Sequence, residues 1–238
     1  MIDIHAHILP GVDDGARDID ESVEIVRWLH HQGVERVIAT PHYIVDTEYS
    51  SPKEINTLLL EELKSKLKGE GVEVELALGN EIYIDREVIS LLRSDTISSM
   101  AGGSYLLVEL PINDVFLNYE DYLQALISMG YKVILAHPER YVIMQKDYKK
   151  LCELCEMGVL LQCNLRSILG SYGKKPEHLI KKLAKEKRIF ALASDTHRVG
   201  KVDYLKIARQ RLKKYYNERE LEQLLTLNPG KVLTNTLR

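Results

Sequence analysis

The stretch KVILAHPER, residues 132–140, joins a short β-rich apolar run to a polar end. Residues 132–136 predict a buried strand. His137 and Arg140 follow that strand directly. In a barrel of parallel strands, functional side chains lie at the carboxyl ends of the strands, where the loops to the helices begin. This stretch therefore predicts a strand that carries polar side chains to a site.

Six further β-rich apolar runs recur along the chain, separated by helical patterns. With residues 132–136, the predicted strands are 2–4, 36–40, 72–78, 104–110, 159–164 and 188–193. Strands that alternate with helices indicate parallel βα units, and seven units predict an α/β fold, a distorted (β/α)7 TIM-like barrel. No linker rich in Gly, Ser or Pro divides the sequence, so we expect a single domain over residues 1–238.

Helix ends can also be read from the sequence. Ser51-Pro52-Lys53-Glu54 has the pattern of a capping box with Pro at the first helical position, and that helix ends at Gly69. Gly33 ends the first helix, and Asn118 is the predicted cap of a helix that ends at Gly130.

Composition limits the classes of partner. The 238 residues are 45% hydrophobic, enough for a substantial core, and the net charge of −3 provides no broad field for nucleic acid or an anionic membrane. No run approaches the roughly 18 apolar residues of a membrane span. The N-terminus lacks the basic region of a signal peptide. We expect a cytoplasmic protein without membrane insertion, and the sequence leaves its oligomeric state open.

The three cysteines, Cys152, Cys155 and Cys163, agree with a reducing compartment. The C-x-x-C pair lies in a helical pattern that ends at Gly158, and no second Cys/His pair stands at zinc-finger distance. No cysteine has an Arg six positions later, so the C-x5-R loop of cysteine-dependent phosphatases is absent. We therefore expect chemistry that depends on metal and not on a thiol.

The opening residues, MIDIHAHILPGVDDGA (1–16), place His5 and His7 two apart on a predicted strand. Side chains two apart on a strand project to the same side, so both imidazoles can reach one metal ion. In an isolated H-x-H, one buried and one exposed histidine would be the commoner arrangement. The other strand ends favour ligation, because they carry the same residue types. The nine candidate ligands are His5, His7, Asp14, His42, Glu81, Glu109, His137, Asp195 and His197.

Histidines placed for packing would scatter, as His30, His31 and His178 do on helical segments. Imidazole and carboxylate ligands without thiolate suit Mn, Fe or Zn, and nine ligands exceed the needs of one ion. With Glu81 bridging, they could hold two or three divalent ions. Water bound to such ions ionises near pH ~7, which supplies a hydroxide nucleophile for attack on a phosphate.

Arg140 stands three residues after His137. A guanidinium grips two phosphate oxygens and offsets charge in the transition state. A surface ion pair, for example with Glu139, is the alternative role.

The ordered strand ends H-x-H, TPH, GNE, HPER and SDTH resemble the PHP (polymerase and histidinol phosphatase) superfamily. More narrowly, MIDIHAHILPGVDDGA with HPERY resembles the bacterial metal-dependent tyrosine phosphatases encoded with capsule or exopolysaccharide genes. The resemblance extends from His5 to His197. It implies a distorted (β/α)7 barrel with three metal ions, usually manganese, and an enzyme that removes phosphate from the phosphotyrosine-rich tail of a bacterial tyrosine kinase.

The resemblance also implies a role for individual residues. Arg140 matches the phosphate-binding arginine, and Lys201 or Arg198 would provide a second cationic contact. Loops 43–52 and 111–119 would form the rim around a phosphotyrosyl ring. The implied ion sites are His5, His7, Glu81 and Asp195; Glu81, Glu109 and His137; and Asp14, His42 and His197. The proposed apolar rim residues are Tyr43, Ile44, Val115 and Phe116.

Three other readings remain open at this point. A small-molecule phosphatase of the histidinol phosphate type would use the same metals with a different pocket. A PHP-type nuclease is disfavoured by the net charge of −3. A regulatory metal-binding domain without catalysis would not need Arg140.

Overall fold

The computed structural model describes residues 1–114, 118–200 and 202–235. Its strands form two parallel sheets, in the orders β1-β2-β4 and β3-β5-β6-β7-β8-β9. The strands are β1 (Ile2–Ala6), β2 (Arg36–Ala39), β3 (His42–Tyr43), β4 (Glu75–Leu78), β5 (Glu81–Tyr83), β6 (Tyr105–Glu109), β7 (Lys132–Ala136), β8 (Leu160–Asn164) and β9 (Ala191–Ala193).

The two sheets form one barrel because two barrel strands are each broken in the middle. β2 and β3 are separated by Thr40 and Pro41, and β4 and β5 by Gly79 and Asn80. The breaks lie side by side, where the backbone N–H of Glu81 and the side-chain amide of Asn80 both donate to the carbonyl of Pro41 (each 3.1 Å). Each broken strand takes part in both sheets.

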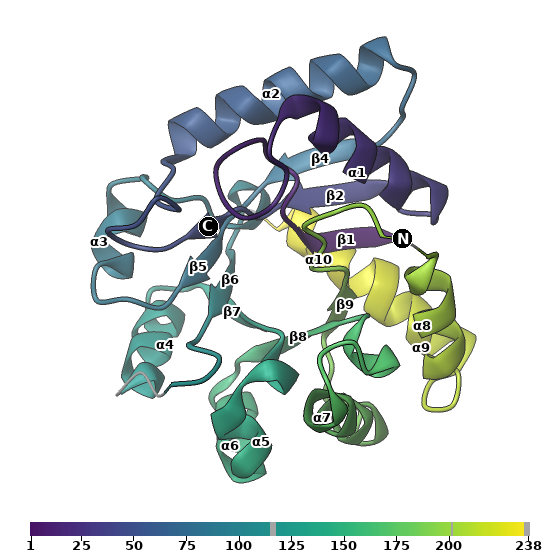
Figure 1. Cartoon of the computed structure of the whole chain (residues 1–238). Coiled ribbons are helices and arrows are strands. Elements are labelled where there is room, and N and C mark those ends of the chain that lie inside the picture. The colour runs from purple at the N-terminus through teal and green to yellow at the C-terminus, as the bar shows by residue number, and fades with distance from the viewer. Residues whose placement is uncertain (115–117, 201, 236–238) are drawn as a thin grey trace.

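The barrel closes between its first and last strands. The backbone N–H of Asp195 donates to the carbonyl of His5 (2.9 Å), and the N–H of His7 donates to the carbonyl of Thr196 (2.9 Å). A parallel bridge joins Ala6 to Thr196. With each broken strand counted once, the described residues form seven parallel strands around the axis, which confirms the predicted α/β barrel (Figure 1).

Helices surround this ring of strands (Figure 1). They are α1 (Ile19–His31), α2 (Lys53–Gly69), α3 (Val88–Arg93), α4 (Tyr119–Ser128), α5 (Val142–Lys146), α6 (Tyr148–Met157), α7 (Lys174–Lys185), α8 (Tyr204–Leu212), α9 (Glu218–Glu222) and α10 (Asn228–Thr234). α10 packs against β1 and against the short turn Met100–Gly102. Within the described ranges, no helix has both the length and the apolar character needed to cross a bilayer.

Two predicted caps are wrong in detail. α2 begins at Lys53, one residue later than expected, with Pro52 at the N-cap position. Ser51 gives no capping bond, because its hydroxyl donates to the side-chain oxygen of Asn56 (2.7 Å). Asn118 precedes α4 in a left-handed conformation and its side chain caps nothing. The C-terminal signals are better predictors: Gly158 ends α6 at a φ of 100°, a backbone conformation that suits glycine.

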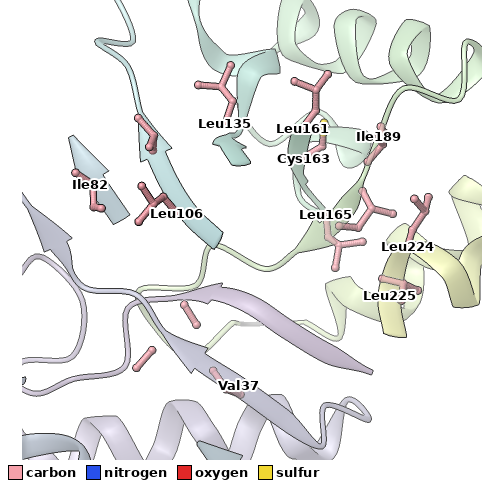
Figure 2. Close-up of a cluster of buried hydrophobic side chains, with 14 of the residues drawn as sticks. Val37, Ile82, Leu106, Leu135, Leu161, Cys163, Leu165, Ile189, Leu224 and Leu225 are labelled. Atoms are coloured by element: carbon pink, nitrogen blue, oxygen red, sulfur yellow. The ribbon is translucent and has the colours of Figure 1, made fainter. Parts of the chain in front are cut away.

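Alternate residues along the strands pack on opposite faces of the barrel wall. The outer face packs against the helices and includes Val37, Ile82, Leu106, Leu135 and Leu161 (Figure 2). A smaller inner cluster contains Ile4, Ile38, Leu107, Ile134 and Ala193. Each fully buried side chain of this size stabilises the fold by about 1.5–3 kcal/mol.

The inner face changes from apolar to polar toward the carboxyl ends of the strands. Two residues after Leu107 comes Glu109, and two residues after Ala193 comes Asp195. In β1 the pairing with β2 shifts between Asp3 and Ala6, because three residues of β1 oppose two of β2. Such a bulge redirects side chains. It places His5 and His7 on the side that Ile2 and Ile4 occupy earlier in the strand.

Candidate metal centre

The predicted ligands converge at the carboxyl ends of the strands. His5, His7 and Glu81 are fully buried, and His137, Asp195 and Glu109 are nearly so. Burial of this many charged and imidazole groups is costly unless they are paired or bind metal. Eight of the nine candidates fall into three groups whose ligand atoms lie within 4.8 Å of one another.

The first group is His5, His7, Glu81 and Asp195. The Nε2 atoms of the two histidines are 3.2 Å apart. Glu81 Oε2 lies 3.1 Å from His5 Nε2 and 3.2 Å from His7 Nε2, and Asp195 Oδ1 lies 3.4 Å from His5 Nε2. The strands β1, β5 and β9 thus bring four ligands to one point.

The second group is His42, Glu81 and Glu109. His42 Nδ1 is 3.1 Å from Glu81 Oε2 and 3.7 Å from Glu109 Oε2. His137, which the resemblance assigned here, approaches the other oxygens of the same carboxylates: its Nε2 lies 2.9 Å from Glu81 Oε1 and 3.6 Å from Glu109 Oε1. The two glutamates therefore lie between His42 and His137.

The third group is His7, Asp14, His42 and His197. Asp14 Oδ1 is 3.2 Å from His197 Nε2 and 3.6 Å from His42 Nε2. His7 and His197 stack with ring centroids 3.9 Å apart. Asp14 is about half exposed, so this group faces the opening of the barrel. His7, His42 and Glu81 each belong to two groups, as bridging or adjacent ligands of several ions would.

Unpaired buried atoms show that the centre fits metal ions. Within the described residues, Glu81 Oε2, His42 Nδ1 and His137 Nδ1 are buried without a hydrogen-bond partner. Buried polar atoms normally have a partner, and each exception in a native fold needs an explanation. Divalent cations bound here would accept the lone pairs of the carboxylate oxygens and imidazole nitrogens, which explains why these buried atoms have no hydrogen-bond partner. Nitrogen and oxygen donors without thiolate suit Mn, Fe or Zn.

Two of the ligands occupy strained backbone positions. His137 and Asp195 have positive φ values of 32° and 51°. Non-glycine residues seldom adopt this region, and it costs of order 1–3 kcal/mol where they do. Both residues follow the last residues of buried strands, β7 and β9. At both residues the change of backbone conformation coincides with the change from strand to candidate metal centre.

Asp13, the neighbour of the candidate ligand Asp14, contacts two of the other candidate ligands. Its Oδ2 accepts from His7 Nδ1 (2.7 Å) and from the backbone N–H of His42 (2.9 Å), while its Oδ1 accepts from the N–H of Gly15 (2.8 Å). A carboxylate on the far nitrogen of a ligating histidine fixes its tautomer and raises its basicity. The adjacent pair Asp13-Asp14 was the available signal.

Gln162 and Asn164 were also missed. Gln162 Oε1 accepts from His5 Nδ1 (2.8 Å), and its amide donates to Asn164 Oδ1 (2.9 Å). Asn164 in turn donates to Asp195 Oδ2 (2.6 Å). β8 therefore supplies the hydrogen bonds that hold ligands from β1 and β9. Two amide residues at alternate positions of an apolar strand were the signal that could have found them.

The charges of the cluster shift the pKa values of its members in opposite directions. Burial opposes ionisation of Glu81, but His5 and His42 hold the pKa of that carboxyl well below its usual range. Burial and the negative charge of Glu81 raise the pKa of Glu109 well above normal. The hydrogen bond from His197 lowers the pKa of Asp14 to about 2.

The pKa values of two of the histidines also shift in opposite directions. Burial lowers the pKa of His42 to about 4, so its imidazole is neutral and ready to bind a metal at neutral pH. Burial also acts against a charged His7, but the carboxylates of Asp13, Asp195 and Glu81 together raise the pKa of His7 well above normal. A cation entering next to His7 must therefore displace a proton.

Arg140 lies at the edge of the centre. Its Nη1 donates to Asp195 Oδ2 (3.0 Å), and its guanidinium stacks on the ring of Tyr172, 4.7 Å from the ring centre. Its side chain is 23% exposed, which leaves part of the guanidinium open to an incoming anion. Glu139, the alternative partner considered for Arg140, is fully buried and accepts from Ser167 (2.6 Å) and the N–H of Asn164 (2.9 Å).

The weaker phosphate candidates take other positions. Arg198 donates to the backbone carbonyls of Asp14 and Gly15 and lies 3.4 Å from Glu21, so its guanidinium is held by the loop after β1. Lys201 lies outside the described residues, as do the rim candidates Val115 and Phe116. Of the other rim residues, Tyr43 is buried in the outer core and Ile44 is half-buried.

An aromatic side chain does stand over the centre. Tyr49, in the loop after β3, stacks on His42 with ring centroids 6.1 Å apart. The cysteines take no part in the centre: Cys152 and Cys155 lie on α6, and Cys163 is buried in the outer core, where burial raises the pKa of its thiol well above normal.

The sequence and structure both match characterised proteins. Residues 1–234 match the family described as capsular polysaccharide synthesis, CpsB/CapC. The chain is 33% identical to the CapC protein of Staphylococcus aureus, over 99% of this chain and 92% of that protein. It is 32% identical to the tyrosine-protein phosphatase YwqE of Bacillus subtilis (strain 168), with the same coverage. It is 25% identical to the tyrosine-protein phosphatase CpsB of Streptococcus pneumoniae, over the full length of both.

A solved structure agrees with the sequence matches. It comes from crystal structures of YwqE from Bacillus subtilis and CpsB from Streptococcus pneumoniae, described as unique metal-dependent tyrosine phosphatases. The superposition has a TM-score of 0.91 at 31% sequence identity and covers 100% of this chain and 96% of that chain. The phosphotriesterase of Mycobacterium tuberculosis shares the fold alone, with a TM-score of 0.61 at 10% identity over 98% of this chain and 94% of that one.

Proposed function

This chain belongs to the CpsB/CapC family and is a metal-dependent tyrosine-protein phosphatase, and from that premise we propose that its substrate is the phosphotyrosine-containing tail of a bacterial tyrosine kinase that controls capsule or exopolysaccharide synthesis. The observation that supports this most is the convergence of the nine candidate ligands, eight in the three groups and His137 on Glu81, beside one partly exposed arginine. The enzyme acts in the cytoplasm, on a kinase tail presented from the inner face of the membrane.

The centre holds three divalent ions, and Mn²⁺ is the metal we propose. The support is the division of the ligands into three groups that share His7, His42 and Glu81. The four carboxylates of Asp14, Glu81, Glu109 and Asp195 would leave two of the six positive charges uncompensated, which matches the charge of a phosphate dianion. When bound, the ions supply Lewis-acid charge to the phosphate and lower the pKa of a water molecule.

The residues of the chain supply the positioning. Asp13 and Gln162 fix the orientation of His7 and His5, and Asn164 holds Asp195. Because these partners are themselves buried or held in place, the ligands need little rearrangement when the substrate binds.

Arg140 binds the phosphoryl oxygens from the edge of the centre. Tyr172 supports one face of the guanidinium and Asp195 holds one of its nitrogens, so the remaining N–H groups point in a fixed direction. A fixed guanidinium gains more from the charge that develops in the transition state than a flexible ammonium would.

The test compares turnover of three phosphate esters by the Mn²⁺-loaded enzyme: a peptide from a kinase tail carrying phosphotyrosine, histidinol phosphate and single-stranded DNA. We expect kcat/KM to be highest for the peptide, by more than tenfold. The metals treat all phosphate monoesters alike, so the preference must come from the surrounding residues. A preference for histidinol phosphate of about tenfold, worth ~1.4 kcal/mol in the transition state, would contradict the proposal.

A further inference from the structure

Two adjoining cavities extend away from Arg140 between α5 and α7. The first, of about 440 Å³, is lined by Arg140 and Tyr172 together with Gln145, Lys174 and Lys175. The second, of about 420 Å³, continues past the same Gln145, Lys174 and Lys175 to His178 and Lys182. We call these two cavities together the α7 groove. It begins at the arginine that faces the metal centre and leads outward over the surface.

The α7 groove is positively charged. Of the described residues that line it, none is Asp or Glu, whereas Arg140, Lys174, Lys175 and Lys182 are all cationic. The three lysines form no ion pair with any residue that the structure describes, and Lys174 and Lys175 are exposed. The neighbouring acid Glu177 pairs instead with Lys181 (2.5 Å). Arg140 is paired with Asp195, so the charge left unpaired among the described residues of the groove is that of its three lysines, a local concentration on a chain whose net charge is −3.

The spacing of the cations suits an extended peptide. Lys174, His178 and Lys182 are four residues apart on α7 and therefore lie on one face of the helix. From Lys174 to Lys182 the helix rises about 12 Å, the length of roughly four residues of extended chain. The aromatic rings of Tyr172 and Tyr148 stand at the two ends, each stacked by a cation of the groove.

We propose that the α7 groove binds the polypeptide that carries the scissile phosphotyrosine, through negatively charged side chains placed up to about four residues from it. This proposal rests on the proposed function, because it assumes that a peptide enters with its phosphate on Arg140. The groups recognised are anionic side chains, either carboxylates or a second phosphotyrosine. Lys174 and Lys175 line both cavities, so they are the specificity-determining residues.

The test uses the Mn²⁺-loaded enzyme and three kinds of peptide with one phosphotyrosine: one with neutral neighbours, one with two glutamates, and one with a second phosphotyrosine. The charged residues are placed within four positions, on either the N-terminal or the C-terminal side. For wild type we expect kcat/KM to be about tenfold higher for an anionic peptide than for the neutral one, and 0.5 M salt should reduce this ratio. The two anionic series distinguish carboxylate from phosphate as the preferred group.

The double variant K174Q/K175Q should lower this ratio to about one- to threefold. The matched control K185Q/K214Q makes the same change of charge at exposed lysines that line neither cavity, and it should keep the wild-type ratio. Equal kcat/KM for neutral and anionic peptides in wild type would overturn the groove proposal. An unchanged ratio in K174Q/K175Q would overturn it as well. Either result would leave the proposed function in place. Binding of anionic phospholipid vesicles that depends on Lys174 and Lys175, without a peptide preference, would also overturn it. Failure to hydrolyse any phosphotyrosyl peptide would contradict both.

Discussion

Three of the five histidines in the centre are held through the ring nitrogen that does not face the ions. His5 Nδ1 is bonded to Gln162, His7 Nδ1 to Asp13 and His197 Nδ1 to the backbone carbonyl of Asp195 (3.2 Å). Each therefore donates from Nδ1 and offers the lone pair of Nε2 to the centre. At this scale the sequence predicts candidate ligands by residue type and position, and the structure brings them together. It does not identify their partners, because a hydrogen bond between His5 and Gln162 joins residues 157 positions apart.

The first prediction at the residue scale concerns Arg140. Replacing it with Ala removes the guanidinium that we propose contacts the phosphate, and we expect kcat to fall by about 10²–10³-fold, the usual cost of losing one donor to transition-state charge. Bound manganese, measured by elemental analysis, should stay close to the wild-type amount, because Arg140 is not a ligand. Arg188→Ala is the control, since Arg188 is an exposed arginine outside the centre. Wild-type turnover in R140A would refute the role given to Arg140.

At the element scale, the loop between β1 and α1 is packed closely against the strand it leaves. A Cβ on Gly15 would lie 2.3 Å from the carbonyl oxygen of His7 and 2.7 Å from Asp13 Oδ1, so no larger residue fits without moving the loop. The loop also returns to the strand through hydrogen bonds, since the N–H of Ala16 donates to the carbonyl of His7 (3.2 Å). Asp13 and Asp14 are positioned by this contact.

The second prediction follows from that contact. Gly15→Ala should displace Asp13 from His7 and weaken manganese binding by about 10–100-fold, the usual effect of losing a partner that orients a ligand. Circular dichroism should show the secondary structure unchanged. Gly69→Ala, at the end of α2 with no atom near its Cβ position, is the matched control and should bind metal normally. Normal metal affinity in G15A would show that the loop does not hold Asp13 in place.

The strands could be predicted from sequence better than the connections between them. All seven apolar runs contain strand residues, because a run of Val, Ile and Leu has few alternatives in a βα pattern. The break between β2 and β3 was not predicted, although Pro41 removes a backbone donor there. The bulge in β1 was also missed, because it depends on pairing with β2 and not on local composition. The helix α9 was not predicted, although Asn217 and Glu220 form a capping box at its start.

At the scale of the whole molecule, the ligands come from strands all around the barrel, and several of them repel one another in the absence of cations. Glu81, Glu109 and Asp195 lie together at the mouth, and the negative charges of Glu81 and Asp195 contribute to the raised pKa of Glu109. Metal ions bind this arrangement only in the folded chain. They therefore stabilise the whole barrel and not one segment of it.

The third prediction is that a chelator lowers the melting temperature. At a free Mn²⁺ concentration about 1,000 times Kd, binding adds ~4 kcal/mol to the stability, and for a chain of this size that corresponds to about 10 °C. Differential scanning calorimetry with and without chelator measures the shift. His5→Gln should lose most of it, whereas His178→Gln, outside the centre, should keep it.

The same shift should become smaller as pH falls. The pKa values of His5 and His7 are raised by neighbouring carboxylates, so both histidines gain protons early on acidification, and protons compete with Mn²⁺ for their nitrogens. We expect the metal-dependent part of the melting temperature to decline below neutral pH. A shift that stayed constant down to pH 5 would contradict ligation by these histidines.

The closure of the barrel between Ile2–Ala6 and Ala191–Ala193 also fixes when the enzyme becomes active during synthesis. Contacts between such distant parts of a chain form late, because the loop that joins them must first be closed. A ribosome that has translated the first six strands has made His5, His7 and Glu81 but not Asp195, the remaining member of their group. We therefore expect the metal centre of a nascent chain to stay incomplete until its last strand pairs with its first.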